Sequence, residues 1–386
     1  MAESVSRRDF VKVATIALAG FAGGCGASGQ STSRAAARDQ KPIYCFPLLG
    51  DIHFDKMSHH VMEWVRKEKA GDERQINNYV KVTETLTPGL LANVGAAIKG
   101  SPATVPFVVQ VGDLVEGLCG SYDLHALQFR DTFAAIDAAA LGVPFLITKG
   151  NHDITGPGAA DSYKKDLIPW LAAQGKQEQF TGASYARKHD DDLFVFFDGY
   201  VPNLEWLERT LQSNKARHVF FVVHQPIIPY NARSNWGVFS READAAKRAQ
   251  LLALLGTHRA IVLSGHLHKY CVLTRAHDAG EIVQLAVSSV LRNADERGAT
   301  QTVLAGVEAY NESLVELEPK FSPDTDAYRR ALLTAEKPSI TRFAYCDVPG
   351  YAMVKVYANR VDADIMVGHS TDAWRTDAIH TATAAS

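Results

Sequence analysis

Short apolar runs of strand length recur along the chain, and stretches with a helical pattern lie between them. Apolar residues spaced three to four apart indicate helices over 124–141, 204–211 and 242–255. Runs rich in β-branched and aromatic residues predict strands at 43–49, 105–111, 143–148, 193–197, 218–223, 260–264, 281–288, 352–358 and 361–367. This alternation predicts an α/β domain built in layers.

Two charged stretches depart from the alternation. Residues 55–75 are rich in His, Lys, Arg and Glu, and they predict a helical insertion near 55–80 at one end of the sheet. Residues 308–338 predict extra helices that prolines interrupt, with solvent-exposed faces. Because no internal repeat or shift in composition marks a second domain, we expect a single domain over 41–370 and a tail at 371–386.

The first part of the chain has the features of an export signal. Arg7 and Arg8 precede an apolar stretch at 13–24 that is too short to span a bilayer. The sequence around the two arginines resembles the twin-arginine signal of bacteria. Residues 1–37 are therefore expected to be a signal and polar linker, cleaved either after the alanines at 35–37 or at Cys25, where the sequence is similar to a lipoprotein box. Either route places the protein in the periplasm or cell envelope, with a lipid on Cys25 as the only expected membrane contact.

The composition excludes several classes of protein. The chain has 386 residues, of which 46% are hydrophobic and 22% charged, which is typical of a soluble globular protein and excludes a collagen-like fibre. Forty Lys and Arg against 43 Asp and Glu give a net charge of -3, so no nucleic-acid partner is indicated. The five cysteines include no CxxC pair, which argues against a disulfide scaffold or a thiolate zinc ribbon.

Short motifs rich in Asp, His and Asn follow several of the predicted strands. In chain order they are Gly50-Asp51-Ile52-His53, Gly112-Asp113-Leu114-Val115-Glu116, Gly150-Asn151-His152-Asp153, His224-Gln225-Pro226 and Gly265-His266-Leu267-His268. Each motif alone is weak, because such sequences are common in turns. Together they follow apolar strands in order, and ligands of α/β sheets collect beyond the carboxyl ends of strands.

This ordered set, GDIH, GDLVE, GNHD, H and GHLH, resembles the calcineurin-like metallophosphoesterase superfamily over residues 43 to about 290. The resemblance implies an α/β fold in which two mixed β-sheets pack as a sandwich flanked by helices, with two metal ions at the strand ends. It also implies a ligand set: Asp51, His53 and His268 for the first metal, Asn151, His224 and His266 for the second, and Asp113 bridging both.

The types of residue in this set suit that chemistry. Imidazole, carboxylate and amide ligands without thiolate suit Fe, Mn or Zn. Two such ions can clamp a phosphoryl group, and a hydroxide bridging them would be acidic enough to attack near neutral pH. His152 would donate a proton or a hydrogen bond to the leaving oxygen, and Asp153 would orient its imidazole and raise its basicity. Glu116 stands where purple acid phosphatases carry the tyrosine that binds ferric iron, so that variant is not expected. Glu116 either supports the metal ligands or is merely a loop carboxylate, and we favour the interpretation as a loop carboxylate.

The sequence therefore predicts an exported, dinuclear metal-dependent phosphoesterase that hydrolyses phosphate mono- or diesters. Its expected partners are a phosphate-ester substrate and the twin-arginine export machinery. Candidate substrate contacts at the rim are His59, His60, Arg66 and Lys67 in the insertion, and Tyr230, Asn231, Arg233 and Trp236 after the His224 motif. Two alternatives stay open: a non-catalytic exported lipoprotein that binds metal or phosphate, and a nucleotide or cell-wall pyrophosphatase.

Overall fold

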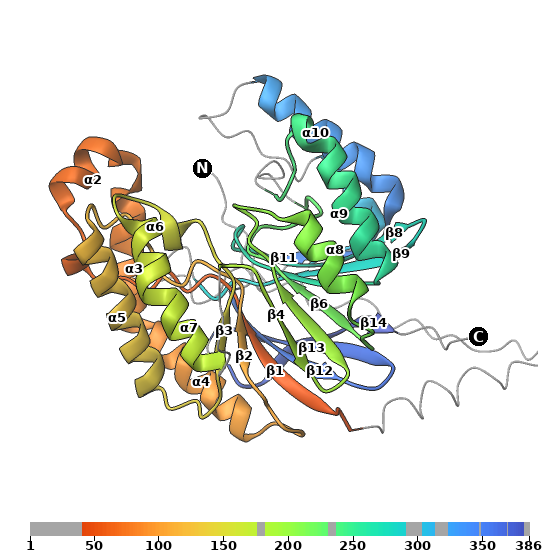
Figure 1. Cartoon of the computed structure of the whole chain (residues 1–386), viewed down its shortest axis with the longest axis horizontal. Coiled ribbons are helices and arrows are strands. Elements are labelled where there is room, and N and C mark those ends of the chain that lie inside the picture. Colours follow the sequence, from red (N-terminus) through yellow and green to blue (C-terminus); the bar gives the residue numbers. More distant parts are fainter. Residues whose placement is uncertain are drawn as a thin grey trace, which may run out of the picture. The chain divides into compact units, whose positions relative to one another are not determined.

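The computed structural model describes residues 41–175, 182–230, 237–290, 303–312, 323–346, 349–368 and 370–381. Over these residues the chain forms two mixed β-sheets that pack face to face, with helices on both outer faces (Figure 1). This α/β sandwich confirms the predicted fold class.

The first sheet has the strand order β14-β13-β12-β1-β2-β3. Its strands are β1 (Tyr44–Leu49), β2 (Val108–Gln110), β3 (Phe145–Ile147), β12 (Gly350–Val356), β13 (Arg360–Val367) and β14 (Ala373–Thr381). The first three run parallel, whereas β12 pairs antiparallel with β1, and β13 and β14 continue the antiparallel half. The C-terminal strands therefore extend the sheet that the N-terminal strand begins.

The second sheet has the order β10-β11-β8-β9-β7-β6-β5-β4. Its strands are β4 (Tyr185–His189), β5 (Asp192–Phe196), β6 (Val219–Val222), β7 (Ile261–Ser264), β8 (Tyr270–His277), β9 (Gly280–Ala286), β10 (Leu304–Ala305) and β11 (Ile340–Cys346). A central parallel group runs from β5 through β6 and β7 to β9, and antiparallel strands flank it on both sides.

Helices cover the outer face of each sheet (Figure 1). On the first sheet these are α3 (Glu73–Thr85), α4 (Thr87–Lys99), α5 (Tyr122–Ala138), α6 (Ala159–Ser162) and α7 (Ile168–Gly175), with α2 (Met62–Glu68) beyond them. On the second sheet they are α8 (Leu204–Gln212), α9 (Ala245–Thr257) and α10 (Pro323–Glu336). The predicted insertion near 55–80 is thus the start of a longer helical region that continues to Lys99.

The main core lies between the sheets and is rich in aromatic rings. The ring of Phe46 on β1 meets Phe194 on β5 and Phe220 on β6 nearly edge-on, with centroids 5.3 and 5.4 Å apart. Burying each phenyl group stabilises the fold by about 1.5–3 kcal/mol. On β5, Leu193 and Val195 point the other way, into a second core beneath the helices. Because β5 is buried on both faces, it appears in the sequence as a continuous apolar run.

The prediction of a tail at 371–386 is wrong, because β14 spans most of this range and pairs with β13. Charged residues interrupt the apolar run in this strand, so the hydrophobic pattern did not predict it. Arg375 and Asp377 on β14 form two hydrogen bonds of 2.6 and 2.8 Å, and Arg342 on β11 donates another to Asp377 at 2.7 Å. Asp377 is buried yet paired, so the strand tolerates its charge.

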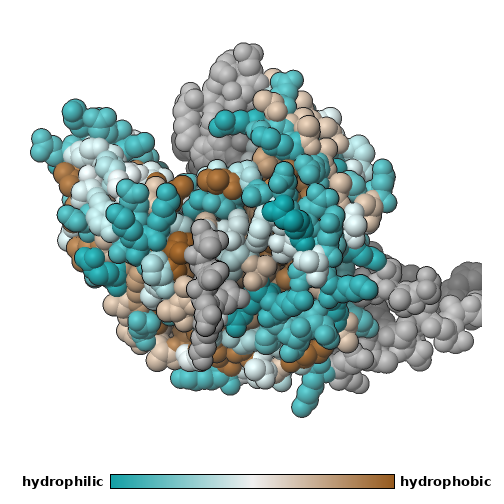
Figure 2. Space-filling view, in the orientation of Figure 1, coloured by the Kyte–Doolittle hydropathy of each residue, from teal (hydrophilic) through white to brown (hydrophobic). Residues whose placement is uncertain are grey.

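The surface in view is mostly hydrophilic, and hydrophobic residues form only small patches on it (Figure 2). The large hydrophobic side chains that are exposed among the described residues are Ile43, Met57, Val61, Val201 and Leu304. Within the same residues, no helix combines the length and the apolar character needed to cross a membrane.

Candidate metal centre

The predicted ligands lie where parallel strands of both sheets end. They follow β1 (Asp51, His53), β2 (Asp113), β3 (Asn151), β6 (His224) and β7 (His266, His268). Because the sandwich brings these strand ends together, the side chains meet in one place although they come from the two different sheets.

The first group contains Asp51, His53, Asp113 and His268, whose candidate ligand atoms all lie within 4.8 Å of one another. The Nε2 atoms of His53 and His268 are 3.0 Å apart. Nε2 of His53 lies 3.7 Å from Oδ2 of Asp113, and Nε2 of His268 lies 3.6 Å from Oδ1 of Asp51. Four nitrogen and oxygen atoms therefore surround one small volume.

The second group contains Asp113, His224 and His266, again within 4.8 Å. Nε2 of His224 lies 3.1 Å from Oδ2 of Asp113, 3.0 Å from Nδ1 of His266 and 3.2 Å from Oδ1 of Asn151. Asp113 belongs to both groups, which is the arrangement expected of a carboxylate that bridges two ions.

Hydrogen bonds to the remote ring nitrogens leave Nε2 of two histidines available. His53 Nδ1 donates to Oε2 of Glu116 at 2.7 Å, and His224 Nδ1 donates to the carbonyl of Val111 at 2.8 Å. Such a bond fixes the tautomer, so the lone pair of the other nitrogen points into the site. Histidines that bind metals are commonly held in this way.

The residues present fit a pair of metal ions. Oδ2 of Asp51 is buried and accepts no hydrogen bond from the described residues, and buried polar atoms normally have a partner. The facing Nε2 atoms of His53 and His268 likewise need a cation or a proton between them. Nitrogen and oxygen donors without sulfur suit Fe, Mn or Zn, as the sequence predicted.

The backbone is strained at several of these positions. His53, Asp113, His266 and His268 all have left-handed conformations, with φ of 48°, 52°, 70° and 53°. Residues held in sparsely populated regions cost about 1–3 kcal/mol each and cluster at functional sites. Gly112 has φ of 93°, and a Cβ there would lie 2.7 Å from Nδ1 of His224, so the motif needs glycine at that position.

Burial and neighbouring charges move the pKa values of the acids in opposite directions. Burial raises the pKa of Asp51 to about 6, although His224 opposes the rise. Burial would also raise the pKa of Asp113, but the imidazoles of His224 and His152 outweigh it and hold that pKa well below its usual range. Asp113 is therefore ionised, as a bridging ligand must be.

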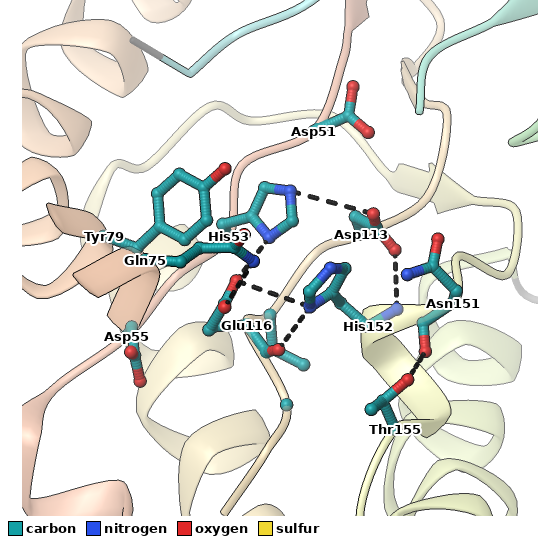
Figure 3. Close-up of polar contacts among 12 residues, drawn as sticks. Asp51, His53, Asp55, Gln75, Tyr79, Asp113, Glu116, Asn151, His152 and Thr155 are labelled. Carbon is teal, nitrogen blue, oxygen red and sulfur yellow. Dashed lines mark hydrogen bonds and ion pairs between the residues drawn. The ribbon is translucent and has the colours of Figure 1, made fainter. Parts of the chain in front are cut away.

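His152 lies beside both groups without belonging to the predicted ligand set (Figure 3). Its backbone N–H donates to Oδ1 of Asp113 at 2.8 Å, and its Nδ1 donates to the carbonyl of Glu116 at 2.7 Å. Burial alone would lower the pKa of His152, but the carboxylates of Glu116 and Asp113 raise it to about 9. The imidazole can therefore carry a proton at neutral pH.

Asp153 does not orient His152, so that prediction is wrong. Its carboxylate accepts backbone N–H groups from Gly150 (2.8 Å), Asp113 (3.1 Å), Leu114 (2.9 Å) and Val115 (3.2 Å). Residues 152–154 form a short helical turn, and successive side chains of such a turn point in different directions. Asp153 instead fixes the loop that carries Asp113.

Glu116 takes the place expected of Asp153, and helix α3 supports both Glu116 and the neighbouring His53 (Figure 3). Glu116 is buried, so our interpretation as a loop carboxylate is wrong. Gln75 donates to its Oε1 at 2.8 Å. The ring of Tyr79 stacks on His53 with centroids 4.3 Å apart, and its hydroxyl lies 3.4 Å from Nδ1 of His268. The i, i+4 spacing puts Gln75 and Tyr79 on one helix face, but no sequence motif marks them.

Among the described residues, the predicted substrate contacts do not gather at a rim. His59 is buried and bonds Asp131 at 3.0 Å, and His60 bonds the buried Asp55 at 2.8 Å. Tyr230 is also fully buried, because it packs in the core beneath the second sheet's helices. Arg66 and Lys67 are exposed and pair with neighbouring carboxylates, Arg66 with Glu73 and Lys67 with Glu68. Asn231, Arg233 and Trp236 lie outside the described residues, as do Arg7, Arg8 and Cys25.

A cleft of about 600 Å³ opens beside Asn151 and His266, on the side of the second group. It is lined by Gly199, Tyr200, Pro202, Gln225, residues 237–241, Asp244 and Lys247. Volumes of 300–1,000 Å³ are typical of ligand sites. The cleft therefore offers room for part of a substrate next to the predicted metal ligands.

Comparison with known proteins agrees with this geometry. The family model of the calcineurin-like phosphoesterase matches residues 48–270, more than half of the chain, and this range contains every predicted ligand. No curated protein matches the chain.

Two solved structures share the fold. A purple acid phosphatase from seeds of yellow lupin (Lupinus luteus) is 13% identical with a TM-score of 0.51, over 89% of this chain and 55% of that one. A dimetal phosphatase from Danio rerio is 12% identical with a TM-score of 0.51, over 89% of this chain and 100% of that one. At such identities the likeness shows the fold alone. The chain spans about half the length of the lupin protein.

Proposed function

The chain belongs to the calcineurin-like phosphoesterase family, and from this premise we propose that it is a two-metal enzyme hydrolysing phosphate mono- or diesters. The observation that carries the proposal is the pair of ligand groups that share Asp113. A site for one ion would not need a common carboxylate between two sets of imidazoles.

In this proposal Asp51, His53 and His268 would hold the first ion, Asn151, His224 and His266 would hold the second, and Asp113 would be shared by both. Two bound divalent ions supply Lewis acidity to the phosphoryl oxygens and lower the pKa of bound water, which makes a nucleophile available near neutral pH. The ions would be Fe, Mn or Zn.

His152 is the residue placed to donate a proton to the leaving oxygen. Because Nδ1 donates to the Glu116 carbonyl at 2.7 Å, the proton for transfer is carried on Nε2. A general acid in this position contributes about 10²–10⁴-fold to the rate. The hydrogen bond from the His152 backbone to Asp113 holds the acid at a set position relative to the bridging carboxylate.

Metal-reconstituted protein should hydrolyse 4-nitrophenyl phosphate or its bis-ester, and elemental analysis should find two ions per chain. Asp113→Asn should weaken the binding of both ions and abolish turnover, because it removes the negative charge that both ions share. Wild type that binds two ions yet turns over neither ester nor a nucleotide pyrophosphate would favour the non-catalytic alternative. Full activity with a single ion would contradict the dinuclear site.

We also propose that the chain is exported through the twin-arginine machinery. The support is the sequence around Arg7 and Arg8, followed by a short apolar stretch. Changing both to Lys keeps the charge but removes the guanidinium pair, so the protein should stay in the cytoplasm. Cys25→Ser tests the lipid separately: a lipidated protein should shift from the membrane fraction to the soluble fraction, and unchanged partitioning would contradict lipidation.

A further inference from the structure

Among the described residues that line the cleft beside the second ligand group, Arg241 is a positive charge without an ion-pair partner. Lys247 lies 3.4 Å from Asp244 and 5.8 Å above the ring of Phe239. Arg241 is exposed, and its guanidinium group makes no ion pair or hydrogen bond with any residue in the described part of the chain, although its backbone carbonyl accepts from the N–H of Asp244 at 3.0 Å. The cleft therefore has one guanidinium group left to pair with an anion, next to an aromatic surface.

The wall of the cleft at Tyr200 is hydrogen-bonded to a predicted metal ligand. Tyr200 donates from its hydroxyl to Oδ1 of Asn151 at 3.1 Å. Its backbone N–H donates to Asp198 at 2.9 Å, and Asp198 also forms a buried ion pair with Lys149. This wall is held by buried charged groups, so a substrate in the cleft would meet a preformed surface.

The lining at Gly199 shows how closely the cleft is built. A Cβ on Gly199 would lie 2.3 Å from Oε1 of Gln225, the residue directly after His224. A side chain at residue 199 would therefore displace the end of Gln225, whose Oε1 has no hydrogen-bond partner among the described residues.

We propose that this cleft binds the leaving group of the ester, and that Arg241 selects substrates whose leaving group carries a second anionic group. The inference rests on the proposed function, because it needs the scissile phosphate to lie at the metal centre beside Asn151 and His266. A guanidinium group can donate two parallel hydrogen bonds to two oxygens of a carboxylate or of a phosphate, so either anion would fit. The body of the leaving group would lie against Phe239.

Two pairs of esters test this selection. One compares 3-carboxyphenyl phosphate with the neutral 3-carbamoylphenyl phosphate, which is closely matched in size. The other compares 1,4-butanediol bisphosphate with 4-methoxybutyl phosphate, so that the second anion is a phosphate. Metal-loaded wild type should prefer the anionic member of a pair by about fivefold in kcat/KM, the size of an exposed ion pair. The preference should appear in KM. It should shrink in 1 M salt, because the Debye length is then only about 3 Å and the exposed charges are screened from each other.

Variants locate the preference. Arg241→Gln should remove the fivefold ratio, and Arg241→Lys should retain part of it, because the charge persists without the paired geometry. Arg209→Gln is the matched control, since Arg209 is an exposed arginine on α8 that pairs with Glu205. If Arg241→Gln keeps the wild-type ratio in both pairs while the neutral esters are hydrolysed, the inference is overturned and the proposed function stands. If wild type hydrolyses none of the esters, the proposed function fails and the inference fails with it.

Discussion

Replacing Glu116 by Gln isolates the support that this carboxylate gives to the first ligand group. The side chain is buried, accepts from His53 Nδ1 at 2.7 Å and from Gln75 at 2.8 Å, and lies 3.4 Å from Nδ1 of His152. Gln keeps the shape but removes the charge. The tautomer of His152 should persist, because its donor bond goes to the backbone carbonyl of residue 116.

The magnitude follows from the hydrogen bond between Glu116 and His53. A hydrogen bond to a charged group contributes about 1.5–3 kcal/mol, against about 1 kcal/mol for a neutral one. Losing about 1.4 kcal/mol corresponds to tenfold weaker binding, at the lower end of the 10–100-fold seen for partners of metal-binding histidines. Mainly the first ion should be affected, because of the two ligand groups that share Asp113 only the first contains His53.

The assay is a titration of the metal-free protein with Mn²⁺ or Zn²⁺, which reports two dissociation constants without depending on turnover. Glu336→Gln serves as the control, because it removes another buried carboxylate, which pairs with Arg248 and Arg275 rather than with a predicted metal ligand. If Glu116→Gln is poorly folded, Gln75→Met should give a smaller change of the same kind. Unchanged binding of both ions in folded Glu116→Gln, or equal weakening of both, would refute the reasoning.

Three further perturbations separate the roles of neighbouring residues. His152→Asn should keep both ions, and its rate of hydrolysis should fall about 10²–10⁴-fold on an alkyl ester but much less on a nitrophenyl ester. Equal falls in rate on the two esters would exclude a role as general acid. Asp153→Asn should lower the free energy of unfolding, measured in urea, by about 2–4 kcal/mol, because an amide cannot accept all four backbone N–H groups. The same variant should reduce the rate of hydrolysis of the two esters by the same factor. Burial, with His218 and Arg259 adding to it, lowers the pKa of His380 on β14 to about 4, below its unfolded value near 6.5. The folded state therefore prefers neutral His380. The contribution of this residue to the free energy of unfolding is fully present above pH 6.5 and is lost as the pH falls towards 4, by up to about 3 kcal/mol. His380→Leu should flatten this part of the pH–stability curve, and an unchanged slope would contradict the assignment.

Much of the metal centre could be predicted because its signals are local. Asp51 and His53 are two residues apart directly after an apolar strand, and His266 and His268 repeat that pattern after β7. Strand periodicity and ligand type are properties of neighbouring residues, so they can be recognised without knowing how the chain folds. The same reasoning failed for Asp153, because the direction of its side chain depends on the turn at 152–154 and on which N–H groups surround it.

The sequence by itself therefore determined the layered α/β class, the strand ends that carry the ligands, and the chemistry those ligands suit. Only the tertiary structure decided which side chains support them. Glu116 reaches His53 across 63 residues, and Gln75 reaches Glu116 across 41. It also decided that His59 and His60 are buried and that residues 373–381 complete a sheet. The physical reason is that burial and hydrogen bonding depend on segments far apart in the chain, whereas the hydrophobic pattern records only the neighbours along it.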